Sequence, residues 1–433
     1  MPAIPRDRSI DSTLALLAEG YTFISARCER LRSDVFETRL MLRRVTCAMG
    51  EDAAAMFYHP GRFSRVHAIP QTALMLLQDA GSAQQLEDEA HLRRKHLFLS
   101  LMTPERVQEL VRGFEQQWQA RAARWETAGE VVLHEELERL LCSAVCQWMG
   151  VPLTEAAVRQ RAAEFAAMIE GAGAVGPRNW KGMLRRSRTE DWARNLIEGV
   201  RAQHISAPEG SPLQEIALHR GADGSLLDSR VATVELINLL RPTMAVARYI
   251  TFSALAMHRY PQCRARLRSG NEDYLDCFAQ EVRRFYPFFP AVGGLAREDF
   301  IWRGIPFPKG SWVLLDLYGT NHDRRIWGDP HLFRPERFRE RERTAFDFIP
   351  QGGGDMLHGH RCAGEAVTLA LMKTAIRLLT RDVEYDVPQQ DLRISLSRMP
   401  AIPRSRFIIG NVRQVIDMHD HARVLRSAEK RVY

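Results

Sequence analysis

The chain has 433 residues, 45% of them hydrophobic, which is enough to bury a large core. The formal net charge is +7, but the arginines are spread along helical segments and no nucleic-acid motif occurs, so we expect a solvated basic surface and no nucleic-acid partner. Seven cysteines without a repeating spacing exclude a disulfide scaffold and favour a reducing, cytoplasmic environment.

Residues 10–285 are predicted to be mostly helical. Amphipathic segments dominate this stretch, and loops rich in glycine and proline interrupt it at residues 206–212 and 221–224. The N-terminal residues contain no apolar signal, and no apolar run of membrane-spanning length occurs elsewhere. We therefore expect no membrane anchor.

Residues 234–250 are hydrophobic on nearly every helical face, which predicts a buried helix. Arg241 lies within it, beside Pro242, which removes a backbone N–H and bends a helix. An unpaired buried guanidinium costs several kcal/mol, so an anion should meet it. A ligand carboxylate suits its forked donors. The alternatives are a pair with a protein carboxylate such as Glu235, or a solvated helix end.

The next elements lead to a glutamate–arginine pair and a strand-rich patch. Glu281 and Arg284 are three residues apart on one helix face, shortly before a proline, and can pair. Strands are expected at residues 300–306 and 312–316, on either side of a Lys-Gly turn. A Pro-Glu-Arg-Phe segment follows at 335–338.

Residues 352–365 form a glycine-rich loop that carries Cys362 and opens into a helix at residues 363–380. Glycines at 359 and 364 would let the backbone turn tightly and approach a flat ligand. The helix N-terminus and loop N–H groups would stabilise a thiolate. Such a thiolate can bind a haem iron axially and favour O–O cleavage on the opposite face.

This loop has two other interpretations, a phosphate-binding loop and a structural cysteine. A phosphate-binding loop is disfavoured, because no Gly-Lys-Ser/Thr follows the glycines and the dinucleotide-binding spacing is absent. A buried structural cysteine is the ordinary alternative, since free cysteines are usually buried.

The three motifs in this order resemble the cytochrome P450 superfamily, in which they lock the proximal side of the haem. Most members carry Gly and Arg four and two residues before the cysteine, where this chain has His358 and His360. The run Gly-His-Arg-Cys-Ala-Gly after Ile-Pro-Gln-Gly-Gly-Gly is similar to the fatty-acid peroxygenase branch, which uses hydrogen peroxide directly.

The resemblance implies a mainly α fold with small β-sheets, the cytochrome P450 fold. It also implies a single haem-thiolate domain at residues 1–412, with a polar, basic tail at 413–433. Haem b would be the cofactor with Cys362 as its iron ligand, and hydrogen peroxide the co-substrate. A fatty acid would be the substrate, and no redox partner would be required.

The resemblance also gives roles to further residues. His91 and Lys95 lie one helical turn apart and would donate to a haem propionate. Their alternative is a basic, solvated helix face. Arg65 and His360 are further candidates for haem binding. Arg241, with Pro242 beside it, would hold the fatty-acid carboxylate, which then acts as the general acid–base.

Three residues would shape the distal pocket. Gln84 lies seven residues before His91, where this branch carries Gln or His above the haem. A neutral amide cannot donate a proton as histidine can, so hydroxylation should outrun loss of the carboxylate. A surface amide is the alternative. Phe288 and Phe289 would line the alkyl channel or belong to the core.

The predicted function is hydrogen-peroxide-dependent hydroxylation of a fatty acid at its alpha and/or beta carbon, because a fixed carboxylate sets these carbons near the iron. The alternatives are a decarboxylase that makes terminal alkenes, a conventional monooxygenase driven by NADPH and a redoxin, and a non-enzymatic haem sensor. Residues 241–245 lack the acid–alcohol pair of conventional monooxygenases. This disfavours the redoxin-driven alternative.

Overall fold

The computed structural model describes residues 4–415, apart from 80, 222 and 341. The long helices that form the body are α5 (Asp88–Leu101), α6 (Pro104–Trp125), α7 (Leu133–Met149), α8 (Glu155–Gly171), α9 (Pro177–Arg201), α11 (Ser229–Arg259), α13 (Glu272–Phe285) and α16 (Glu365–Arg377). Shorter helices are α1 (Thr13–Glu19), α2 (Phe23–Leu31), α3 (Glu51–Phe57), α4 (Gln71–Leu77), α10 (Pro212–Leu218), α12 (Pro261–Arg268), α14 (Leu317–Thr320) and α15 (Arg324–Trp327). The predicted predominance of helix is confirmed.

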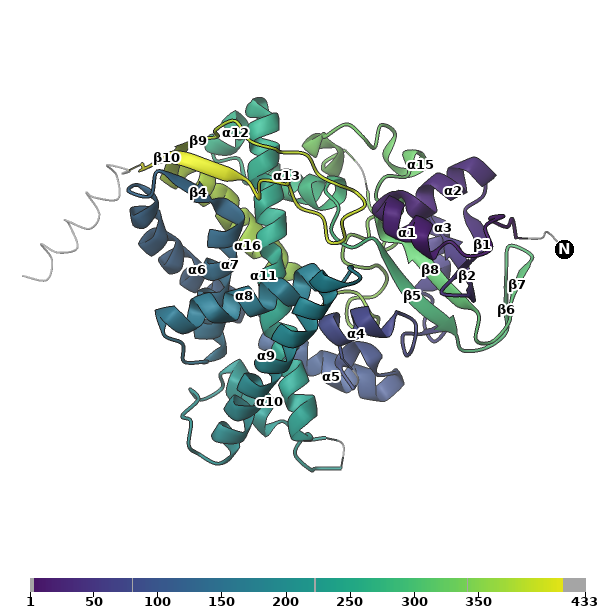
Figure 1. Ribbon diagram of the computed structural model, residues 1–433, viewed down its shortest axis with the longest axis horizontal. Helices are drawn as coiled ribbons and strands as arrows, with labels where there is room; N and C mark the ends of the chain where they lie inside the picture. The colour runs from purple at the N-terminus through teal and green to yellow at the C-terminus, as the bar shows by residue number, and fades with distance from the viewer. Residues whose placement is uncertain (1–3, 80, 222, 341, 416–433) are drawn as a thin grey trace, which may run out of the picture.

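The strands form three small sheets. The five-stranded sheet has the order β1 (Val35–Leu40), β2 (Arg43–Ala48), β8 (Trp312–Asp316), β5 (Ala291–Ala296), β3 (Phe63–Ser64). The three-stranded sheet has the order β4 (Glu130–Val132), β10 (Ile408–Gln414), β9 (Val383–Asp386), and β6 (Phe300–Trp302) pairs with β7 (Ile305–Phe307). The five-stranded sheet and the helical body lie at opposite ends of the long axis (Figure 1).

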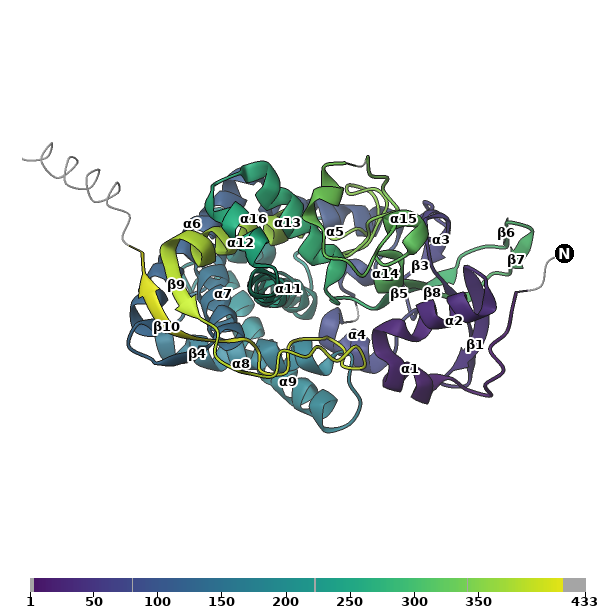
Figure 2. The same ribbon diagram turned by 90° about the horizontal axis from the view of Figure 1, so that it is seen from above.

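Helix α11 runs through the centre of the helical body, and seen end-on it is surrounded by other helices (Figure 2). It begins where the Asp228 carboxylate caps the N–H groups of Arg230 and Val231, and it ends before Pro261, which disfavours helix in the preceding residue. Most of its residues are buried, as predicted, and it continues through Pro242. The centre of the molecule is therefore one long apolar helix that carries a few buried polar groups.

The strands between residues 35 and 64 were missed by the sequence analysis, which assigned this region to helix. β1 and β2 form an antiparallel hairpin in which Leu40 pairs with Arg43. The two turn residues, Met41 and Leu42, have positive φ angles of 52° and 62°. Hairpin turns of this kind usually carry Asn-Gly or Asp-Gly, so Met41 and Leu42 do not mark a turn in the sequence.

The strand predicted at 312–316 is confirmed as β8, and the helix after the cysteine loop is confirmed as α16. The strand predicted at 300–306 is instead the hairpin of β6 and β7, which turns at Arg303 and Gly304 with positive φ angles. Strand β10 continues to Gln414, beyond the predicted domain boundary at 412. The remainder of the predicted tail, residues 416–433, lies outside the described residues.

Asp316, at the end of β8, is a buried carboxyl whose ionisation opposes folding. Its Oδ1 accepts from the N–H of Gly319 at 2.6 Å, and its Oδ2 has no hydrogen-bond partner among the described residues. Burial raises the pKa of Asp316 to about 7, against the backbone hydrogen bonds, which lower it. The folded pKa thus exceeds the unfolded value of about 3.9. Stability from the protonated form is complete below about pH 4 and is lost as pH rises through about 7.

We therefore expect Asp316→Asn to raise the melting temperature at pH 8 by several degrees and to have little effect at pH 4, because an amide caps the helix without a charge. Asp323→Asn is the matched control. Asp323 also caps a short helix, but it is paired with Arg325, so its replacement should destabilise at pH 8. A lower melting temperature for Asp316→Asn at pH 8 would contradict the prediction.

Candidate active site

The predicted pair of Glu281 and Arg284 forms a fully buried brace on α13. Arg284 Nε lies 2.7 Å from Glu281 Oε2. Glu281 Oε1 also accepts from Arg337 Nε at 3.2 Å and from the Arg334 N–H at 2.8 Å. One carboxylate thus joins α13 to the short 3-10 helix Pro335–Phe338. The Glu-x-x-Arg motif at 281–284 and the Pro-Glu-Arg-Phe motif at 335–338 therefore meet at one carboxylate, that of Glu281.

The cysteine loop contacts the N-terminal part of the chain closely. Gly354 has φ 79°, and a Cβ there would lie 3.0 Å from Cβ of Tyr58, so the loop needs glycine for both backbone and space. The Cys362 N–H donates to the Gln351 carbonyl at 3.2 Å, and Gln351 Nε2 lies 3.7 Å from the Cys362 sulfur. The sulfur is held in a defined place before the first turn of α16.

The sequence predicted that loop N–H groups would favour the thiolate, and the Gly364 N–H does lower the pKa of the Cys362 thiol. Burial raises the pKa of the Cys362 thiol and outweighs both the Gly364 N–H and the Arg283 guanidinium, which lower it. A bound metal cation reverses this balance, because a coordinating thiol is deprotonated. The site therefore favours a thiolate only together with a cation.

A second ion-pair network supports the loop, and the sequence analysis missed it. Arg283 Nη2 donates to Glu365 Oε1 at 2.6 Å and to Gln351 Oε1 at 2.9 Å. Arg361 Nε donates to Glu365 Oε2 at 2.8 Å. Glu365 lies in the first turn of α16, where a carboxylate is favoured. The position of Glu365 at the start of the predicted helix was the sequence feature that could have indicated its role.

His91 and Lys95 of α5 face the cysteine loop, and their donation to a haem propionate stays a prediction. His91 Nδ1 lies 2.9 Å from the Ala83 carbonyl, and the His91 and His360 rings are 4.1 Å apart. Lys95 Nζ donates to the Arg361 carbonyl at 2.8 Å. Both side chains are buried, so they do not form a solvated helix face.

The same region carries a concentration of basic groups. Burial lowers the pKa of Lys95 to about 8. Burial, together with the charges of nearby Arg65 and Lys95, lowers the pKa of His360 to about 2, so His360 is neutral. Arg65 packs over the Phe57 ring at 4.4 Å, and burial lowers its pKa. Positive charge is thus poorly compensated here, which fits a ligand with carboxylates of its own.

Arg241 lies on α11, buried, with its guanidinium turned toward α4. Nη2 donates to the Leu77 carbonyl and to Asn238 Oδ1, the latter at 3.2 Å. Nη1 is buried and has no hydrogen-bond partner among the described residues. Burial, together with the charge of Arg186, lowers the pKa of Arg241 to about 9. The guanidinium therefore has an unused donor and a strong electrostatic preference for an anion.

Glu235, the protein carboxylate considered as a partner of Arg241, is bound elsewhere. Its Oε1 accepts from Arg94 Nη1 at 2.5 Å and from the Ala83 N–H at 2.9 Å, and its Oε2 accepts from Asn238 Nδ2 at 3.3 Å. Burial raises the pKa of Glu235, although Arg94 lowers it. Glu235 is therefore paired with Arg94 and hydrogen-bonded to Asn238.

The other residues predicted to shape the distal pocket, Gln84, Phe288 and Phe289, differ in burial and packing. Gln84 belongs to the 3-10 helix Ala83–Gln85, and its Oε1 is buried without a hydrogen-bond partner among the described residues. Phe288 stacks on Tyr249 of α11 at 4.3 Å. Phe289 is 39% exposed. Phe288 thus packs on the central helix and Phe289 lies nearer the surface.

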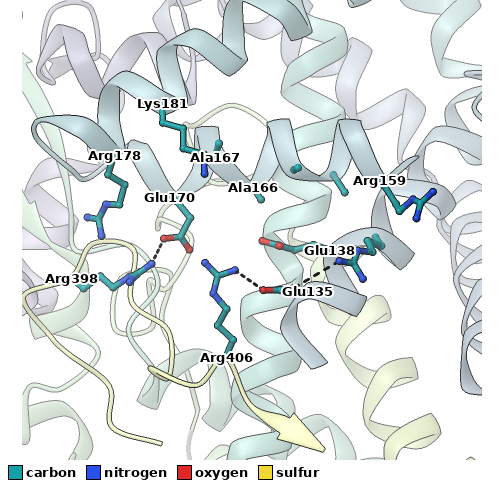
Figure 3. Close-up of a pocket in the computed structure, with 13 residues that line it drawn as sticks. Glu135, Glu138, Arg159, Ala166, Ala167, Glu170, Arg178, Lys181, Arg398 and Arg406 are labelled. Atoms are coloured by element: carbon teal, nitrogen blue, oxygen red, sulfur yellow. Dashed lines mark hydrogen bonds and ion pairs between the residues drawn. The ribbon is translucent and has the colours of Figure 1, made fainter. Parts of the chain in front are cut away.

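A hollow of about 400 Å³ elsewhere on the molecule lies between α7, α8, the start of α9 and the C-terminal segment (Figure 3). In it Glu170 pairs with Arg398, and Glu135 Oε1 lies 3.7 Å from Arg406 Nη1. The wall on α8 combines alanines with Arg159 and Glu170. The residues predicted to bind the cofactor or the substrate do not line it, so we assign it to a surface ion-pair network.

Part of this chain matches a family model and several curated proteins. The family model described as Cytochrome P450 matches residues 270–409. Among curated proteins, Cytochrome P450 4e2 of Drosophila melanogaster is 32% identical over 122 residues, and Cytochrome P450 3A15 of Cavia porcellus is 31% identical over 129 residues. These alignments cover 28% and 29% of this chain, but only 22% and 25% of those proteins.

Solved structures match over nearly the whole chain. Cytochrome P450SP alpha (CYP152B1), in complex with (R)-ibuprophen, is 47% identical with a TM-score of 0.91, covering 94% of this chain and 99% of that one. The chain belongs to the cytochrome P450 family. The similar solved structures are of the CYP152 branch: P450EX alpha (CYP152N1) with myristic acid is 39% identical (TM-score 0.92), and a variant of P450 OleT with arachidonic acid is 34% identical (TM-score 0.93). Each of these two covers 96% of this chain and 100% of its own.

The predicted family and fold of this P450 are thereby confirmed. Family membership implies a haem bound by a cysteine thiolate, and Cys362 is the cysteine of the loop that carries the motif. The poorly compensated cations beside this loop fit the two propionates of a haem. Within the described residues, no helix of this P450 is both long and apolar enough to cross a bilayer.

Proposed function

We propose that this P450 hydroxylates fatty acids at the alpha and/or beta carbon with hydrogen peroxide, without a redox partner. The observation that carries this proposal is the buried Arg241 guanidinium, whose Nη1 has no hydrogen-bond partner in the described part of the chain, on an apolar helix without an acid–alcohol pair at residues 241–245. The CYP152 relatives support it, because the ligands named with three of their structures are carboxylic acids.

The cofactor would be haem b, held by Cys362. His91, Lys95, Arg65 and His360 lie beside the loop and would surround the propionates. When bound, the haem supplies the oxidising chemistry, and the thiolate favours O–O cleavage. The protein contributes a sulfur held in a defined place and the cationic side chains of Arg65 and Lys95.

Arg241 would bind the carboxylate of the fatty acid through Nη1 and Nη2. Nη2 now donates a hydrogen bond to the Leu77 carbonyl. The bound carboxylate then takes a proton from hydrogen peroxide and returns it to the distal oxygen, so the substrate supplies the missing general acid–base. Pro242 lies next to this anchor in α11. Fixing the head group places the alpha and beta carbons, rather than the chain end, at the reactive centre.

The reaction is tested by incubating the purified holoenzyme with a panel of fatty acids and hydrogen peroxide, without reductase or NADPH. We expect 2- and 3-hydroxy acids by mass spectrometry, and no product from the matching fatty alcohols. A parallel reaction with NADPH, a redoxin and its reductase, with catalase present to remove peroxide, should give no product. Turnover only in that second reaction would establish the conventional monooxygenase instead.

The balance between hydroxylation and decarboxylation should depend on Gln84. An amide cannot supply a proton in the way that histidine can, so we expect hydroxy acids as the main product and terminal alkenes as a minor one. Gln84→His should increase the alkene fraction severalfold, and Gln85→His is the neighbouring control. Mostly alkene from the unmodified enzyme would contradict this prediction, and an unchanged ratio in Gln84→His would remove Gln84 from the mechanism.

A further inference from the structure

The turn that ends α4 is tied to α11 by consecutive residues. The Leu77 carbonyl accepts from Arg241, and the Gln78 carbonyl accepts from Asn238 Nδ2 at 3.1 Å. Asp79 follows directly, buried and in the left-handed region with φ 71°. A protein carboxylate is thereby placed two residues from the carbonyl that holds the proposed substrate anchor.

The Asp79 carboxylate is bound by Arg186 of α9. Arg186 Nη2 lies 3.0 Å from Asp79 Oδ2, and both side chains are 2% exposed. Arg186 Nε also donates to Glu190 at 2.6 Å. Arg230 lies 3.9 Å from Asp79 Oδ1, but it is largely exposed, so solvent weakens its attraction. Among the described residues, Arg186 is therefore the buried cation that pairs with Asp79.

Asp79 also acts on Arg241. Its negative charge raises the pKa of Arg241, although burial and the charge of Arg186 lower it more strongly. A carboxylate that interacts with this guanidinium competes with a substrate carboxylate, because both would accept from the same N–H groups. Arg241 retains its unused Nη1 while Asp79 is bound to Arg186.

We propose that Arg186 is a positioning residue that holds Asp79 and thereby keeps Arg241 available for the substrate carboxylate. The inference rests on the proposed function of Arg241. Once Arg186 is removed, Asp79 turns its charge toward Arg241 and becomes an internal competitor of the fatty acid. Arg186 thus sets substrate affinity without a role in the chemical step.

Arg186→Gln should raise the dissociation constant of a fatty acid, measured by calorimetry, about tenfold or more, as expected for losing a hydrogen bond to a charged group. KM should rise in parallel, while kcat stays within about twofold. The double variant Arg186→Gln/Asp79→Asn should bind within about threefold of wild type, because the competitor has lost its charge. Asn tolerates the left-handed backbone at this position.

Three controls make the result decisive. Arg194→Gln, on the same helix and more than one-third exposed, should leave the dissociation constant unchanged. Asp79→Asn alone should bind the fatty acid at least as tightly as wild type, and this variant still tests the proposal if Arg186→Gln does not fold. The matching fatty alcohol, which has no charge, should bind equally to all variants.

A double variant that binds as weakly as Arg186→Gln would overturn the inference, since it would assign the loss to packing. Unchanged affinity in Arg186→Gln, or weaker binding by Asp79→Asn, would overturn it as well. Failure of the proposed function is distinguishable, because Arg241→Ala would then keep wild-type affinity for the fatty acid.

Discussion

Cys362→Ala is expected to abolish turnover and to remove the optical signature of thiolate ligation in the reduced, CO-bound state. The physical reason is that the sulfur is the ligand that a haem iron would find at the end of this loop, while the surrounding cations would still attract the propionates. The measurement is the CO difference spectrum, together with the haem content of the purified protein.

Cys277→Ala is the matched control for this prediction. Cys277 is buried on α13, the helix of the Glu281 brace, and burial raises the pKa of its thiol as it does for Cys362. This variant should retain the spectrum and the activity. A normal thiolate spectrum from Cys362→Ala would assign the iron to another residue.

Arg241→Ala is expected to weaken fatty-acid binding by about 2–5 kcal/mol, the usual cost of removing one partner of a buried charge pair. Peroxide-driven turnover should fall at least as strongly, because the carboxylate that relays the proton is no longer held. Arg259→Ala, at the exposed end of the same helix, is the control and should behave as wild type. Turnover at the wild-type rate in Arg241→Ala would refute the mechanism.

Arg241→Lys should rescue binding only in part, and only at low pH. An ammonium cannot hold both oxygens in a fork geometry. The burial that lowers the pKa of Arg241 to about 9 acts on a lysine whose ordinary pKa is already lower, about 10.4. The charged form exists below the pKa, so affinity of this variant should fall steeply as pH rises from 6 to 9. A flat pH profile would contradict this.

Much of the proximal side could be predicted from sequence because its interactions are local or carried by spaced motifs. Glu281 and Arg284 are three residues apart on one helix, and that spacing is sufficient to predict their contact. The apolar run around Arg241 predicted a buried helix for the same reason. The shared use of Glu281 by Arg337 required the fold, because 56 residues separate the two.

The distal network was not predictable in the same way. Arg241 donates a hydrogen bond to the backbone carbonyl of Leu77. Because every residue has a backbone carbonyl, the sequence cannot indicate which one accepts this bond. Asp79 and Arg186 are 107 residues apart on different elements. The turn at Met41 and Leu42 was missed because it lacks the usual residues for its conformation.

The order of strands in the five-stranded sheet leaves β2 without one of its two neighbours while the chain is being synthesised. β2 pairs with β8 in parallel, with Thr46 opposite Val313, so the N-terminal hairpin is complete long before its neighbour leaves the ribosome. At bacterial or eukaryotic translation rates this interval lasts on the order of tens of seconds. During that time one edge of β2 has no partner and can pair with another nascent chain. Arg43 and Arg44, both exposed at the start of β2, place positive charge on that edge, and like charges oppose such pairing.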